Sequence, residues 1–119
     1  MTDNDARMQE ILRGMRDEVA ARVTATAADL ATLTHDRSSS NDDDEHDPDG
    51  VTLSAEWSRL RALADAAEDE LRQVDEALAR LDAGNYGLCA SCGNPIPVAR
   101  LEIRPFATLC VPCAEKKAA

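Results

Sequence analysis

The sequence predicts a mainly α-helical protein: a long antiparallel two-helix coiled-coil hairpin, followed by a small domain containing four cysteines and a short C-terminal helix. The 119 residues include only one Trp, one Tyr and one Phe, whereas a compact globule of this length usually needs more aromatic side chains in its core. Apolar residues recur at alternating gaps of three and four, which is typical of paired helices. All four cysteines follow residue 88. We therefore divide the chain into a hairpin over residues 1–84 and a cysteine domain over residues 85–119.

The first predicted helix covers residues 2–34. Thr2 and Asp5 have the spacing of an N-terminal capping box. A heptad stripe with one stutter follows, formed by Met8, Leu12, Met15, Val19, Val23, Thr26, Leu30 and Leu33. This stripe is the face that we expect to pack against a second helix.

The following segment has no periodicity and is strongly acidic. Residues 35–50 contain seven acidic side chains against a single Arg37, and Ser, Asn, Pro and Gly favour turns. We predict an acidic loop over residues 35–51.

The second predicted helix covers residues 52–83 and ends at Gly84, a typical C-cap residue. Its stripe is unbroken over four heptads and consists of Leu53, Trp57, Leu60, Ala64, Ala67, Leu71, Val74, Leu78 and Leu81. Two apolar seams joined by a loop bury each other as an antiparallel hairpin. The acidic loop is then expected at one end of the hairpin and the cysteine domain at the other.

The cysteines follow the pattern C-x2-C-x17-C-x2-C, formed by Cys89, Cys92, Cys110 and Cys113. Two C-x2-C pairs at this separation are typical of one zinc ion held by four thiolates. Four protein ligands leave no open coordination position, so the zinc is expected to be structural. Two disulfides or a dithiol redox switch are the alternative readings of the same pairs.

A segment this short cannot fold on its apolar core alone, so zinc binding and folding of the cysteine domain are expected to occur together. We expect Tyr86 to pack where this domain meets the hairpin. The predicted small core over the zinc consists of Ile96, Leu101, Ile103, Phe106 and Leu109.

Composition excludes several classes of function. The formal net charge of -10 argues against direct nucleic-acid binding, because the phosphate backbone favours Lys and Arg. No apolar run is long enough to span a membrane, and the polar N-terminus does not resemble a secretory signal. We expect a cytoplasmic monomer, although the apolar seams could also pair between molecules. No conventional catalytic constellation is present, so we do not expect an enzyme.

Several short motifs surround the cysteines: Tyr86-Gly87, Cys89-x-x-Cys92-Gly93, Ile96-Pro97, Arg100-Leu101-Glu102, Arg104-Pro105, Ala107 and Cys110-x-x-Cys113. Together these motifs closely resemble the DksA/TraR zinc-finger family. The predicted hairpin matches the architecture of that family. The resemblance implies a transcription regulator whose globular end binds bacterial RNA polymerase at the rim of the secondary channel. The coiled coil then brings acidic tip residues near the catalytic centre, without sequence-specific DNA contact.

The resemblance also assigns candidate site residues. The tip residues are Asp42, Asp43, Asp44, Glu45, Asp47 and Asp49, and they depart from the Asp-x-x-Asp-x-Ala tip of the best-known members. Arg104 and Arg100 are the candidate residues for docking to polymerase or to the alarmone ppGpp. Members that respond to ppGpp carry basic residues at three positions, which here are Gln73, Arg104 and Ala114. Because only one of the three is basic, we expect weak or absent ppGpp dependence.

Three alternative functions stay open. A coiled-coil adaptor for another protein is the first, because the tip is not of the standard pattern. An enzyme or a thiol redox sensor is the second. Calcium binding is the third, since Glu45, Asp47, Asp49, Gly50 and Glu56 match positions of an EF-hand loop, although Pro48 fits such a loop poorly.

Overall fold

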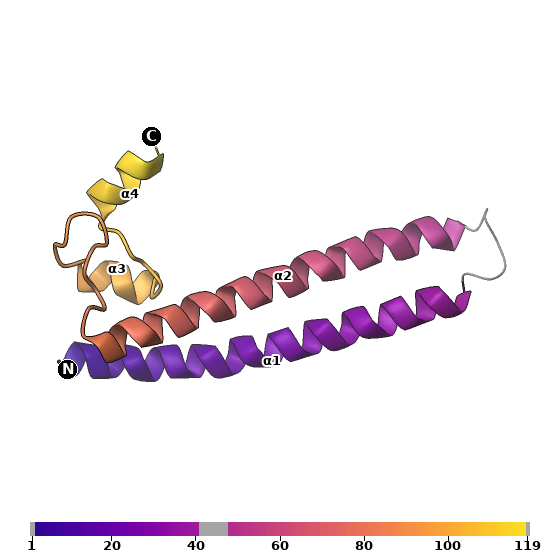
Figure 1. Ribbon diagram of the computed structural model, residues 1–119, viewed down its shortest axis with the longest axis horizontal. Helices are drawn as coiled ribbons and strands as arrows, with labels where there is room; N and C mark the ends of the chain where they lie inside the picture. Colours follow the sequence, from indigo (N-terminus) through magenta and orange to yellow (C-terminus); the bar gives the residue numbers. More distant parts are fainter. Residues whose placement is uncertain (1, 41–47, 119) are drawn as a thin grey trace. The chain divides into compact units, whose positions relative to one another are not determined.

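The computed structural model describes residues 2–40 and 48–118, with side chains described over residues 2–36 and 52–118. Figure 1 shows its helices in chain order: α1 (Asp3–Ser40), α2 (Pro48–Ala83), α3 (Val98–Ile103) and α4 (Val111–Ala118). An isolated antiparallel bridge joins Leu88 to Pro95. The predicted mainly helical fold class is confirmed. Within the described ranges, no helix is long and apolar enough to cross a membrane.

Both long helices extend into the segment that we predicted as a loop over residues 35–51. α1 continues through Ser40, and α2 already begins at Pro48. Each further residue adds a backbone hydrogen bond once a helix has started, so even weak helix formers such as serine can extend it. Pro48 is the first residue of α2, where the missing N–H of proline is tolerated.

Local hydrogen bonds define where α1 begins and where α2 ends. At the start of α1, the Asp5 N–H donates to Thr2 Oγ1 at 3.0 Å and the Thr2 N–H donates to Asp5 Oδ2 at 3.3 Å. This is the predicted capping box, with Asp in place of the usual Glu. At the end of α2, Gly84 adopts a positive φ of 81°. The N–H groups of Gly84 and Asn85 donate to the carbonyl oxygens of Leu81 and Arg80, the two bonds of a Schellman motif.

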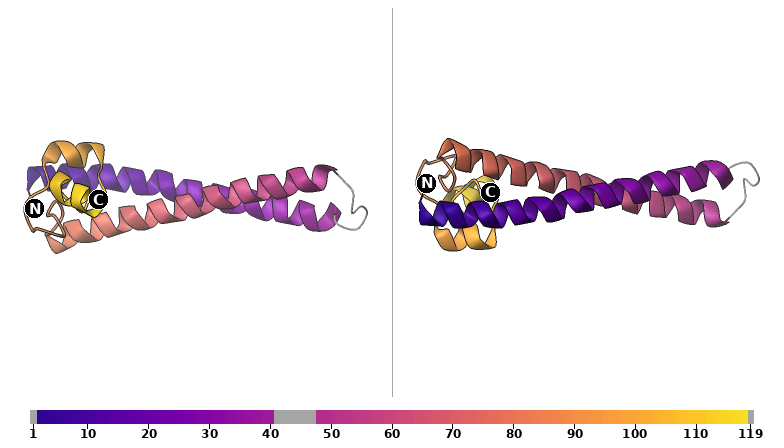
Figure 2. Two further views of the ribbon diagram at one scale, coloured as in Figure 1. Left: turned by 90° about the horizontal axis from the view of Figure 1, so that it is seen from above. Right: turned by 90° about the horizontal axis from the view of Figure 1, so that it is seen from below.

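The chain forms two compact units, one made of Met1–Arg16 with Gln73–Ala119 and the other of Asp17–Arg72. In each unit, α1 and α2 lie side by side and run in opposite directions (Figures 1 and 2). The first unit therefore combines the cysteine domain with the neighbouring helix ends. The predicted boundary between residues 84 and 85 coincides with the end of α2. It does not separate two compact units, because residues on both sides of it pack into the first unit.

The predicted stripes form the contact between α1 and α2. Every stripe residue is buried or half-buried, and Met8, Leu12, Val19 and Val74 are the most completely buried large side chains. Ion pairs flank the seam in both units. Arg16 Nε lies 2.7 Å from Asp75 Oδ1 in the first, and Arg22 Nη1 lies 3.0 Å from Glu70 Oε2 in the second.

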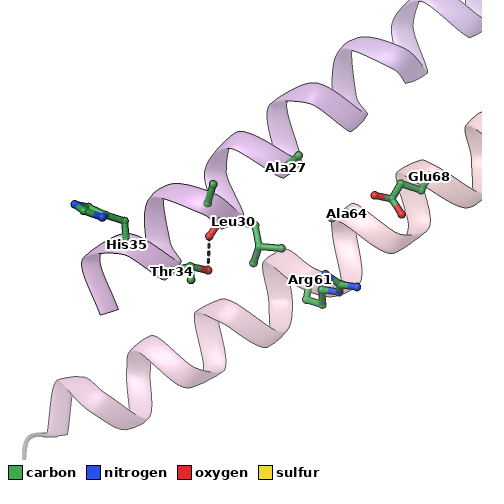
Figure 3. A pocket seen from close by; sticks show the side chains of 8 residues that line it. Ala27, Leu30, Thr34, His35, Arg61, Ala64 and Glu68 are labelled. Atoms are coloured by element: carbon green, nitrogen blue, oxygen red, sulfur yellow. Dashed lines mark hydrogen bonds between the residues drawn. The ribbon is translucent and has the colours of Figure 1, made fainter. Parts of the chain in front are cut away.

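The seam within Asp17–Arg72 leaves an open groove of about 490 Å³. Short side chains at Ala27, Ala31 and Ala64 line it. In Figure 3, Leu30 points into the space between the helices, whereas His35 points away from α2. The Trp57 indole Nε1 donates to Thr34 Oγ1 at 3.3 Å in this unit. The short side chains of these three alanines leave room for the groove.

The small core near the cysteines differs from the prediction at one position. Ile96 and Leu101 are 3% and 2% exposed, and Phe106 and Leu109 are half-buried, but Ile103 is 81% exposed. Ile103 is the last residue of α3, and Leu101 already fills the inward position of this six-residue helix. The placement of Ile103 in the core was wrong.

Candidate metal centre

The first cysteine pair lies in a tight loop between two glycines of positive φ. Gly87 has φ 83° and Gly93 has φ 76°. The Cys89 N–H donates to Asn94 O at 2.8 Å, and the Gly93 N–H donates back to Cys89 O at 2.9 Å. Inside this loop the Cys92 N–H points at Cys89 Sγ, 3.5 Å away. These bonds place both thiols of the pair on one side of the loop.

The second cysteine pair is placed by α4 and by the segment that precedes it. Cys110 comes directly before α4 and Cys113 lies in its first turn, where the Ala114 N–H donates to Cys110 O at 2.9 Å. The Ala90 N–H donates to Thr108 O at 2.7 Å and so links the two cysteine loops. Arg100 Nε donates to Leu109 O at 3.0 Å, which braces the residue before Cys110.

The ligand atoms of Cys89, Cys92, Cys110 and Cys113 all lie within 4.8 Å of one another. Cys92 Sγ and Cys110 Sγ are 3.8 Å apart, and all four cysteines are free thiols. A zinc ion at about 2.3 Å from each of four sulfurs gives a tetrahedron with edges of about 3.8 Å. A disulfide needs about 2.05 Å between sulfurs. The geometry therefore fits one tetrahedral zinc ion with no open position.

Local hydrogen bonds shift the pKa values of two thiols in opposite directions in the metal-free cluster. The backbone N–H of Cys92, followed by that of Cys110, lowers the pKa of the Cys89 thiol to about 6. Hydrogen bonds with the Cys110 and Cys89 thiols raise the pKa of the Cys113 thiol to about 12. A metal ion that binds all four sulfurs must therefore displace a proton from Cys113 at neutral pH.

A second candidate feature is a pocket of about 370 Å³ in the unit that holds the cysteines. It is lined by Met15, Gln73, Arg100, Ile103, Arg104, Pro105, Phe106 and Ala107. The structure thus brings both predicted docking residues, Arg100 and Arg104, to one pocket. Sequence reasoning assigned Met15 only to the apolar stripe of the first helix and did not predict that it lines this pocket, because folding brings it there from the other end of the chain.

The acidic tip is the part of the prediction that the structure describes least. Asp42, Asp43, Asp44, Glu45 and Asp47 lie outside the described residues. Asp49 lies within α2, as does Gly50, so neither belongs to a calcium-binding loop. Glu56 instead forms an ion pair with Arg59, whose hydrogen bond lowers the pKa of the Glu56 carboxyl. The EF-hand reading is therefore wrong.

Comparisons with known proteins agree with this geometry. Residues 84–117 match the family model of the prokaryotic dksA/traR C4-type zinc finger. The RNA polymerase-binding transcription factor DksA of Caulobacter vibrioides is 37% identical to this chain over 114 residues, which cover 91% of this chain. The chain belongs to the DksA/TraR zinc-finger family. As a member of this family, it carries one structural zinc ion, which the four clustered cysteines fit.

Solved structures extend the similarity beyond the zinc finger. Transcription factor DksA2 from Pseudomonas aeruginosa has a TM-score of 0.81 and 28% identity, and the match covers 97% of this chain and 83% of that one. Among curated sequences, the RNA polymerase-binding transcription factor DksA of Escherichia coli strain K12 is 29% identical over 102 residues, which cover 83% of this chain. The chain spans 66% of the length of the Caulobacter relative and 58% of the Escherichia coli relative.

Proposed function

We propose that this DksA/TraR family protein is a transcription regulator that binds bacterial RNA polymerase in the cytoplasm. In this proposal it enters the secondary channel, brings its acidic tip near the catalytic centre and makes no sequence-specific contact with DNA. The observation that carries the proposal is the 37% identity, over 91% of this chain, to a relative named as an RNA polymerase-binding transcription factor.

The distribution of charge supports this assignment. Asp17–Arg72 contains fifteen acidic and five basic residues, so this unit alone accounts for the whole formal net charge of -10. The unit with the zinc finger has as many basic as acidic residues. An acidic segment is attracted to a basic, magnesium-containing centre and repelled by nucleic-acid phosphates. The charged part of the molecule therefore suits a protein-lined channel better than a DNA groove.

The pocket around Arg104 is the proposed polymerase-docking surface of the zinc-finger unit. Arg104 is exposed, and Ile103 beside it presents an apolar side chain to solvent. An exposed apolar residue next to an exposed cation suits an interaction surface, where apolar contacts add affinity and charge adds orientation. Arg100 also lines the pocket, but its Nε is committed to Leu109 O. We therefore assign the main electrostatic contact to Arg104.

The residues that line the same pocket also indicate how the protein responds to ppGpp. Gln73 and Arg104, two of the three positions that hold basic residues in responsive relatives, both line it. Gln73 has no positive charge with which to neutralise a phosphate, and Ala114 at the third position has none either. We propose that any effect on transcription persists without ppGpp and changes little when ppGpp is added.

Binding is tested by competition with another secondary-channel factor for purified RNA polymerase. Wild-type protein is expected to compete, and Arg104→Glu to compete at least about tenfold less well. Arg13→Glu is the matched control, because Arg13 is an exposed arginine on α1 of the same unit that does not line the pocket. If wild-type protein fails to bind polymerase, the proposed function is wrong.

The tip is tested separately by in vitro transcription. Asp47→Asn with Asp49→Asn is expected to abolish the change in promoter-complex lifetime while polymerase binding is retained. Asp17→Asn with Asp29→Asn removes the same charge from exposed positions on α1 of the same unit and is expected to keep activity. Polymerase binding without any effect of the tip would instead favour a passive, channel-blocking adaptor.

A further inference from the structure

A third pocket lies beside the zinc centre and contains two lysines. It has a volume of about 440 Å³ and is lined by Ala90, Ser91, Thr108, Leu109, Cys113, Lys116 and Lys117. Lys116 and Lys117 follow Cys113 by three and four positions in α4. Helical residues at these separations share one face, with about 5–6 Å between Cβ atoms. Both ammonium groups are therefore carried on the helix face that presents the Cys113 thiolate.

The two lysines have no acidic partner of their own in the structure. Both are exposed, and neither side chain forms an ion pair or a hydrogen bond with any residue of the described ranges 2–36 and 52–118. Lysine side chains are flexible and place their charged ends where the local potential is favourable. The nearest strong potential on this face is that of the metal centre.

That centre carries an excess of negative charge. Four thiolates and one Zn²⁺ give a net charge of about -2, and coordinating thiols are fully deprotonated. Apart from Lys116 and Lys117, the unit has eight acidic and six basic residues, so its other side chains do not offset this charge. A cation close to the sulfurs therefore stabilises the zinc-bound form over the metal-free form.

The four sulfurs are not equally stabilised by the backbone. Cys89 Sγ accepts the Cys92 N–H at 3.5 Å and belongs to a residue that is only 3% exposed. In the described part of the chain, no backbone N–H donates a hydrogen bond to Cys113 Sγ, and Cys113 is partly exposed in the pocket. The charge of neighbouring side chains therefore matters more for stabilising the Cys113 thiolate than for stabilising the Cys89 thiolate.

We propose that Lys116 and Lys117 are charge-balancing residues of the zinc centre, which offset the negative charge of the thiolates on the Cys113 side and raise the affinity of the finger for zinc. They act through the Cys113 sulfur and are not ligands themselves. This role does not depend on RNA polymerase. It gives α4, which contains no buried residue, a role in metal retention.

The test is the equilibrium affinity for zinc, measured by competition with a chelator of known zinc affinity. An equilibrium measurement is chosen because lysines can also speed the approach of an anionic chelator, which alters rates. Lys116→Gln with Lys117→Gln is expected to bind zinc about three- to tenfold more weakly at low ionic strength. Glutamine has nearly the helix propensity of lysine, so α4 should keep its helical content. In 1 M salt, where the Debye length is about 3 Å, the difference should nearly vanish.

Two controls separate local charge from other causes. Lys116→Arg with Lys117→Arg keeps both charges and is expected to keep the wild-type zinc affinity. Arg13→Gln with Arg104→Gln removes two charges from exposed positions of the same unit outside this pocket. An equal loss of affinity in this arginine pair would show a general charge effect and overturn the proposal. Wild-type affinity in the lysine-to-glutamine protein at low salt would overturn it as well.

Discussion

The Tyr86 hydroxyl donates a hydrogen bond to the Pro105 carbonyl oxygen, 2.8 Å away and nineteen residues later in the chain. Tyr86 is 8% exposed, and burial is the main cause that raises the pKa of its hydroxyl, so the group keeps its proton and can donate. This bond joins the segment before the first cysteine pair to the segment after α3. It therefore links two segments of the zinc finger by a contact that does not involve the metal ligands.

Replacing Tyr86 with Phe tests this link. We expect Tyr86→Phe to lower the free energy of unfolding of the zinc-bound protein by about 1 kcal/mol, because the Pro105 carbonyl loses a partner while the ring packing is kept. Differential scanning calorimetry measures the change. Tyr86→Leu should lose more, since it also removes aromatic packing. A wild-type melting temperature for Tyr86→Phe would mean that water replaces the hydroxyl.

Two glycines are expected to respond oppositely to the same substitution. Gly14 lies inside α1, and a Cβ there would meet nothing within 4 Å, so Gly14→Ala should stabilise the protein by about 0.5–1 kcal/mol. Gly87 has a positive φ, and its Cβ would lie 3.3 Å from Leu101 Cδ1. Gly87→Ala should therefore destabilise the protein by at least about 1–2 kcal/mol. Chemical denaturation measures both, and a stabilised Gly87→Ala protein would contradict this account of the turn.

The exposed position of Ile103 can be tested against the buried Leu101 of the same helix. Leu101→Ala is expected to reduce the free energy of unfolding by about 2–5 kcal/mol, because it opens a cavity beside Gly87. Ile103→Ala should change stability by less than about 0.5 kcal/mol. Thermal melts of the two zinc-bound variants make the comparison. Comparable losses of unfolding free energy in the two variants would mean that Ile103 is part of the core.

Zinc affinity is expected to rise with pH. The metal-free Cys113 thiol, with a pKa of about 12, is protonated throughout the neutral range and must lose its proton when zinc binds. Between pH 6 and 8, the displaced Cys113 proton alone should strengthen binding about tenfold per pH unit. Below about pH 6 the Cys89 thiol is also protonated, so the slope should steepen. Competition titrations across pH 5–8 measure this slope, and a flat profile would contradict it.

Much of the helical architecture could be predicted because it depends on local periodicity. The stripes from Met8 to Leu33 and from Leu53 to Leu81 determine which helix faces are buried, and Gly84 marks the end of α2. The extent of α1 and α2 into the acidic segment could not be predicted. Ser38–Ser40 and Pro48–Gly50 have weak helix propensity, and propagation of helices that are held by packing overrides it.

The sequence alone predicted the four metal ligands, because two C-x2-C pairs at this spacing are typical of a zinc ion held by four thiolates. Only the tertiary structure decided which residues surround that centre. It excluded Ile103 from the core, brought Met15 and Arg104 to one pocket, and brought Ala90 and Ser91 to the pocket that Cys113 shares with the two lysines. The physical reason is that ligand spacing is a local property of the chain. Exposure, pocket lining and charge proximity arise instead from contacts between residues far apart in sequence.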